Sequence, residues 1–178
     1  MNKEGSFKPV AIVLVASMLI ALFWNSISFI RNAVHGVLDP SAGALLRMNV
    51  TWGMLIIVLI IAIITTIIQK YATDQKTLKE LKKEQKLLQE EMKKYRDNPA
   101  KVMELQKKSF EFIPKTMKLS MRAMAYTGIP LILFFRWFMD VFNAMDSPKF
   151  FGFLSWFWFY LIFTMIFSSI IRKIFKVV

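Results

Sequence analysis

The chain has 178 residues, of which 56% are hydrophobic and 15% aromatic, and it carries a formal net charge of +12. Soluble domains rarely combine such a composition with apolar runs of about 20 residues, so composition excludes a large soluble core and predicts a membrane protein. The positive charge suits a partner with phosphates, either anionic lipid head groups or RNA. The absence of cysteine excludes disulfides and thiolate chemistry.

The first apolar run, residues 9–30 (PVAIVLVASMLIALFWNSISFI), is long enough to span a bilayer. Its basic flank resembles that of a signal peptide, but no small-residue cleavage motif follows it directly, so we expect an uncleaved anchor. Its more polar second half leaves open a helix lying along the outer face of the bilayer. In the connection 31–49, the segment 31–38 has the pattern of a short amphipathic interfacial helix.

Residues 50–69 (VTWGMLIIVLIIAIITTIIQ) form the clearest span, with Trp52 as an interfacial anchor. Two further spans follow the charged middle of the chain. Residues 120–140 contain Pro130, which predicts a kink, and residues 150–171 are rich in aromatic side chains. The sequence thus predicts an all-α integral membrane protein with three core transmembrane helices. Its expected divisions are 1–49, 50–70, 71–118 and 119–178.

Between the first two core spans lies a densely charged helical segment, residues 71–118. Its first half has a heptad seam, which is typical of a coiled coil and consists of Leu78, Leu81, Gln85, Leu88, Met92 and Tyr95. Pro99 breaks that helix, and Asp97 or Asn98 can cap a second one. The second helix has its own stripe, Met103, Gln106, Phe110 and Ile113, and Pro114 is expected to end or kink it. We therefore expect an antiparallel coiled-coil hairpin; the alternative is a solvated helix pair that acts only as a spacer.

Lysine and arginine residues concentrate in the hairpin and the C-terminal tail, whereas the loop 141–149 holds only Lys149. The positive-inside rule therefore predicts that the hairpin and the C-terminus are cytoplasmic. With this orientation, polar side chains of all three core spans fall in the cytoplasmic half of the membrane. These candidate groove residues are Thr65, Thr66, Gln69, Ser120, Arg122, Thr127, Thr164 and Ser168.

The shared depth of these residues favours a water-accessible recess open to the cytoplasm. The alternative is that each hydroxyl bonds back to its own helix or holds neighbouring helices together, and that Arg122 extends to the head groups. Beside the recess, Met117, Met121 and Met124 have the spacing of one helix face and suit a surface that binds varied apolar segments; ordinary core packing would give the same stripe.

A span, a cytoplasmic hairpin and two closely spaced spans, the first with an internal proline, form a pattern that resembles the YidC/Oxa/Alb membrane insertase superfamily. The segments KYRDNPAKVMELQKK and YTGIPLILFFRWF look most like its archaeal YidC-like branch, which is similar to the insertase subunit of the ER membrane protein complex. The resemblance covers roughly residues 50–175. It implies a hydrophilic groove and a mobile hairpin that meets ribosomes or nascent clients. Bacterial members carry a groove arginine on the first core span; residues 50–69 have none, which leaves Arg122 as the nearby candidate.

The sequence therefore predicts an insertase of the archaeal plasma membrane that acts on nascent membrane proteins. Hairpin residues Lys93, Lys94, Arg96 and Lys101 are candidates for contact with a ribosome, and anionic lipids are further expected partners. The alternatives are a small ion channel, against which stands the lack of carboxylates within the spans, and a non-catalytic coiled-coil scaffold. We expect no enzymatic activity, no cofactor and no metal, because the sequence has one histidine, His35, and no glycine-rich phosphate loop or catalytic triad pattern.

Overall fold

The computed structural model describes residues 7–177, which form eight helices joined by short connections. The elements are α1 (Phe7–Leu22), α2 (Ser28–Leu38), α3 (Ala42–Met48), α4 (Val50–Ala72), α5 (Gln75–Lys94), α6 (Pro99–Phe110), α7 (Phe112–Ala144) and α8 (Trp156–Phe175). Three of them, α4, α7 and α8, are long and apolar enough to cross a membrane, and α1 is a shorter apolar helix. The predicted all-α fold with three core spans is confirmed.

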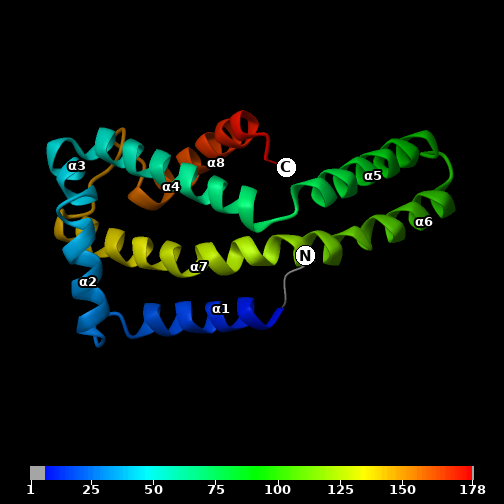
Figure 1. The fold of residues 1–178 in the computed structure, drawn as a ribbon. Helices are drawn as coiled ribbons and strands as arrows, with labels where there is room; N and C mark the ends of the chain where they lie inside the picture. Colours follow the sequence, from blue (N-terminus) through cyan, green and yellow to red (C-terminus); the bar gives the residue numbers. More distant parts are fainter. Residues whose placement is uncertain (1–6, 178) are drawn as a thin grey trace.

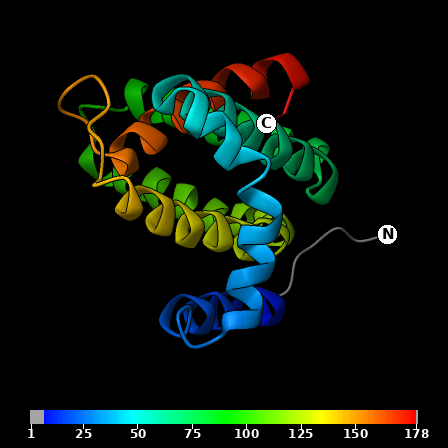
Figure 2. The ribbon, with the colours of Figure 1, turned by 90° about the vertical axis from the view of Figure 1, so that its left-hand side faces the viewer.

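The helices form a bundle with two different ends (Figure 1). α1 packs along α7, and α4 packs against both α7 and α8. At one end, α2 crosses from the level of α1 to that of α3 and α4, as the end-on view in Figure 2 shows. At the other end, α5 and α6 extend beyond the bundle. We call these the α2 end and the hairpin end.

The N-terminal apolar run is not a single helix. α1 ends at Leu22, the chain bends through residues 23–27, and α2 starts at Ser28. α1 lies beside the core span α7, and a Cβ at Gly128 of α7 would come within 2.7 Å of the Val13 side chain. That α1 is a membrane anchor stays a prediction. The predicted amphipathic helix matches α2 within a few residues.

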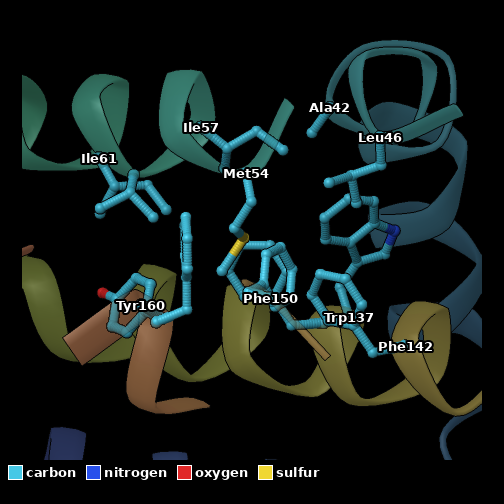
Figure 3. Packing of buried hydrophobic residues seen from close by; sticks show 12 residues of the cluster. Ala42, Leu46, Met54, Ile57, Ile61, Trp137, Phe142, Phe150 and Tyr160 are labelled. Carbon is cyan, nitrogen blue, oxygen red and sulfur yellow. The ribbon is translucent and has the colours of Figure 1, made fainter. Parts of the chain in front are cut away.

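The core lies at the α2 end, between α4, α7 and the start of α8 (Figure 3). Aromatic rings fill most of it: Trp137, Phe138 and Phe142 of α7 are fully buried, Phe142 contacts Phe150, and Phe150 contacts Phe159 of α8. Because lipid is as apolar as these side chains, close packing rather than removal from water supplies most of the stabilisation. This cluster fixes how α4, α7 and α8 are arranged where they meet the α2 end.

One predicted boundary of the last spans differs from the structure. The third core helix begins at Trp156 rather than Phe150, because residues 145–155 form a connection in which Phe151 and Gly152 have positive φ. Phe150 instead turns back onto Phe159, with ring centroids 4.4 Å apart. Pro130 lies inside α7, a helix of 33 residues, and the kink expected there stays a prediction.

The hairpin consists of α5 and α6, which run antiparallel and contact each other (Figure 1). Asn98 caps α6 by accepting a hydrogen bond from the Lys101 backbone N–H at 3.1 Å, and Pro99 occupies the first turn. Leu78 and Leu105 are the buried residues of the two helices. That this pair is a regular coiled coil stays a prediction.

The predicted packing stripe of the second hairpin helix was wrong, because Met103, Phe110 and Ile113 are exposed. The chain breaks at Glu111, and Pro114 lies in the first turn of α7, where its missing N–H costs no helical hydrogen bond. α6 is thus held between the turn after α5 and a long helix fixed in the bundle. These two constraints set its rotation and turn Leu105 inward.

Candidate functional site

A cavity of about 250 Å³ lies where the hairpin joins the core spans. α4, α5, α7 and α8 all contribute to it. We call it the junction cavity; it is lined by Gln69, Thr73, Gln75, Leu78, Lys82, Thr116, Ser120, Ala123, Met124, Thr127, Arg172 and Val177. Amides, hydroxyls and two cationic side chains thus share one hollow, and within residues 7–177 no carboxylate lines it.

Hydrogen bonds between side chains and backbone fix the wall of the cavity at the α4–α5 junction. Thr73, the first residue after α4, donates its hydroxyl to the Gln69 carbonyl at 2.5 Å. The Gln75 amide donates to the same carbonyl at 3.0 Å and also to the Thr73 hydroxyl. Asp74 caps α5 by accepting from the backbone N–H groups of Lys76 and Thr77. These contacts set the sharp change of direction between the span and the hairpin.

The opposite wall is one face of α7. Thr116, Ser120, Ala123 and Thr127 recur at steps of three and four residues, which places them on one side of the helix. Thr127 donates its hydroxyl to the Ala123 carbonyl at 2.9 Å, so part of its hydrogen-bonding capacity is used within the helix. Ser120 and Thr127, which are seven residues apart, both line the cavity.

Three of the predicted groove residues, Gln69, Ser120 and Thr127, meet at the junction cavity. Four others whose side chains are described do not line it: Thr65, Thr66, Thr164 and Ser168. Thr65 lines a separate hollow of about 40 Å³ and donates its hydroxyl to the Ile61 carbonyl at 2.8 Å. Thr66 is buried, and Thr164 and Ser168 are half-buried outside the cavity lining. The side chain of Arg122 lies outside the described part of the chain. The polar hollow thus lies next to the hairpin, whose residues Leu78 and Lys82 also line it.

The cationic side chains of the cavity were not predicted. Lys82 comes from the hairpin helix α5, and Arg172 comes from the last turn of α8. In the sequence, Arg172 reads as part of a basic tail. One signal could have identified it: Arg172 follows Thr164 and Ser168 at steps of four, so it continues the polar face of the last span.

The predicted methionine stripe is divided. Met117 and Met124 are exposed, whereas Met121 between them is buried. Exposed apolar residues are spaced by seven on each of the two helices: Met103 and Phe110 on α6, and Met117 and Met124 on α7. All four are about half exposed or more. We call these four residues the exposed seam; its last member, Met124, also lines the junction cavity.

The predicted basic contact residues lie around the tip of the hairpin. Lys93, Lys94 and Arg96 are exposed. Lys101 forms an ion pair with Glu104 at 2.7 Å, and Lys108 approaches the same carboxylate at 3.1 Å. The hydrogen bonds from these two lysines lower the pKa of Glu104. Exposed positive charge is thus densest at the α5 side of the tip.

The family of the chain follows from comparison with known proteins. Residues 35–151, about two thirds of the chain, match the family model described as "Integral membrane protein EMC3/TMCO1-like". The match covers α3 to α7, including the hairpin and two walls of the junction cavity. No curated protein and no solved structure matches the chain. The chain belongs to the EMC3/TMCO1-like family of integral membrane proteins, a family associated with membrane protein insertion.

Proposed function

We propose that this protein helps nascent membrane proteins enter the bilayer by sheltering their hydrophilic flanks in the junction cavity. The observation that carries the proposal is a polar, cation-bearing hollow at one end of three apolar spans. Moving a charged side chain to the bilayer centre costs about 2.5–3.5 kcal/mol on insertion scales. Amides, hydroxyls and cations at the cavity offset part of this cost, and the client's apolar segment then enters lipid without nucleotide hydrolysis.

The exposed seam and the hairpin complete the proposal. The seam gives an apolar client segment flexible methionine and phenylalanine contacts on its way to the cavity, a role first suggested by Met117, Met121 and Met124. Lys93, Lys94, Arg96 and Lys101 would contact ribosomal RNA or anionic lipids. The hairpin and the C-terminus would face the cytoplasm, consistent with their excess of lysine and arginine. The archaeal YidC-like branch and the archaeal plasma membrane remain the finer assignments that we propose.

Insertion of a client into liposomes that contain the purified protein tests the role of the cavity. Gln69→Leu combined with Ser120→Leu removes polar groups from two walls of the cavity. If the cavity offsets about half of the insertion cost, the yield should fall about tenfold for a client with a charged flank. Ser168→Leu is the matched control, since Ser168 is polar and half-buried but lies outside the cavity lining. Equal insertion by the double variant and the parent protein would refute the proposal.

A flux measurement separates this function from the alternative of a small ion channel. Proton- or cation-coupled transport generally uses carboxylates within the membrane, and among the described residues none lines the junction cavity. We expect proteoliposomes to insert clients without any increase in ion permeability. Ion flux that is abolished by the cavity variants would favour the channel. A scaffold predicts instead that the cavity variants keep full activity.

A further inference from the structure

A second polar cluster lies at the α2 end and takes no part in the junction cavity. It joins the α1–α2 arm, residues 7–39, to the core span α7. Asp140 of α7 accepts hydrogen bonds from the Trp24 indole N–H at 2.8 Å and from Arg31 Nε at 2.9 Å. Asp39, directly after α2, accepts one from the Trp137 indole N–H at 2.7 Å. Both carboxylates thus connect the arm with α7.

His35 of α2 lies between the two carboxylates. Its Nδ1 is 3.1 Å from each Asp39 oxygen, and its Nε2 is 3.1 Å from Asp140 Oδ2. A neutral imidazole has one N–H, so one of these contacts would set a nitrogen lone pair against a carboxylate oxygen. The imidazolium donates from both nitrogens and satisfies both contacts. With both carboxylates ionised, the cationic form of His35 is thus the form that donates to both of them.

The other charged groups around His35 do not replace it. Arg31, on the same helix, is paired with Asp140. Arg47 of α3 donates to the Asp39 backbone carbonyl at 3.0 Å rather than to its carboxylate, and Arg136 of α7 lies over the Trp24 ring, 5.8 Å from its centroid. His35 is thus the side chain that contacts both carboxylates, and only a quarter of that side chain is exposed.

We infer that His35 is a positioning residue, a doubly donating imidazolium that fastens the α1–α2 arm to α7 in a pH-sensitive way. Histidine as a class changes charge between about pH 5 and 8. Raising the pH on this side of the membrane removes one of the two donors and leaves a carboxylate facing a lone pair. One contact of His35 with a carboxylate is then lost, and α2 moves more freely against the end of α7, while Trp24 and Arg31 still donate to Asp140.

The arm is in contact with the rest of the bundle well beyond the cluster. α1 lies along α7, and Met124 lines both the junction cavity and the hollow between α1 and α7. Movement of the arm therefore changes the surroundings of a residue at the opposite end of the bundle. This inference does not depend on the proposed function, because it concerns the position of the arm and not the insertion of clients.

The protonation state can be measured directly, since the chain contains one histidine. The full chain, labelled with nitrogen-15 histidine and placed in lipid nanodiscs, should give one pair of ring-nitrogen signals. At about pH 6 we expect both nitrogens to carry protons and to couple across hydrogen bonds to the carboxylates. A single neutral tautomer at that pH would overturn the inference. This measurement uses the unaltered protein, so a folding defect in a variant cannot obscure it.

The position of the arm can be followed with spin labels at Gly36→Cys and Asn143→Cys. The chain has no other cysteine, a Cβ at Gly36 meets nothing within 4 Å, and Asn143 is exposed on the last turn of α7. We expect a narrow distance distribution at low pH, and a broader one with a longer mean at high pH. In the His35→Lys variant, whose side chain stays charged, the distance distribution should be narrow at low and at high pH. In the His35→Gln variant, the distribution should not change with pH. An unaltered distribution in the parent chain, or a pH response that persists in His35→Gln, would refute the inference.

Discussion

The two ends of the bundle use polar residues in opposite ways. At the α2 end, Asp39 and Asp140 are each surrounded by hydrogen-bond donors from other elements, beside a core of packed aromatic rings. At the hairpin end, Gln69, Lys82 and Arg172 line a hollow. Paired polar groups hold helices in one arrangement, whereas polar groups that line a cavity can receive a ligand. The comparison indicates that the α2 end carries much of the stability, and it is the hairpin end that we propose for the function.

The aromatic contacts between α7 and α8 reinforce this division. Phe135, Phe138 and Phe142 of α7 meet Trp156 and Tyr160, which belong to the first turns of α8. Toward the hairpin end, the hydroxyls and amides of the junction cavity replace such ring contacts. Ring packing thus dominates at one end of these helices, and a polar hollow at the other.

The largest effect should come from removing a ring at the α2 end. Phe138 is fully buried and contacts several aromatic neighbours, so Phe138→Ala should lower the free energy of unfolding by about 3–5 kcal/mol. Reversible denaturation in mixed detergent micelles measures this loss. Phe153→Ala, at an exposed ring of the α7–α8 connection, is the control and should change the free energy by about 0.5 kcal/mol or less. Equal losses in the two variants would contradict the assignment of the stable core.

A smaller, local effect is expected in the hairpin. Leu105 is buried against the rest of the hairpin, and Leu105→Ala should weaken the α5–α6 pair by about 2 kcal/mol or more. Amide hydrogen exchange in α5 and α6 should become about thirtyfold faster, with little change in α4 or α8. Met103→Ala, which truncates an exposed residue of the same helix, should leave exchange nearly unchanged. Faster exchange in Met103→Ala than in Leu105→Ala would instead support the packing stripe that the sequence predicts, with Met103 facing into the hairpin.

The cap of α6 should contribute less. Asn98→Ala removes the acceptor for the Lys101 backbone N–H and should cost about 1 kcal/mol, which corresponds to about fivefold faster exchange in the first turn of α6. Asp97→Ala is the neighbouring control, because Asn98 and not Asp97 accepts this capping bond. If Asp97→Ala accelerated exchange in the first turn of α6 more than Asn98→Ala does, Asp97 rather than Asn98 would be the capping residue.

The smallest effect should be a change of stability with acid at the α2 end. Burial raises the pKa of Asp39, but hydrogen bonds from Trp137 and His35 and the nearby positive charges outweigh it, so the pKa is lowered. The carboxylate therefore stabilises the fold above about pH 4, the usual value for aspartate, and this contribution is lost as the pH falls through the lowered pKa. Asp39 is half exposed, so solvent screening keeps the contribution small.

Unfolding measured between pH 5 and pH 3 tests this last point. The parent protein should lose stability on acidification, and Asp39→Asn should lose less, since its side chain does not titrate. An equal acid response in both proteins would show that other carboxylates dominate it.

The sequence predicted the parts of the site that depend on spacing along one helix. Ser120 and Thr127 share a face of α7 because seven residues are close to two helical turns, and Pro99 fixed the start of α6. It could not predict which residues of different helices meet. Thr65 and Gln69 are one turn apart on α4, yet Gln69 lines the junction cavity, and Thr65 faces a small apolar hollow.

By itself, the sequence determined that this is an all-helical membrane protein with three core spans and a charged helical segment, because apolar length and helical periodicity are local properties. The tertiary structure decided three things: that α1 lies along α7, that Leu105 rather than Met103 faces into the hairpin, and that Arg172 joins Gln69 and Ser120. Each depends on the rotation of one helix relative to another. That rotation is set by packing across the whole bundle, which no single segment of the sequence contains.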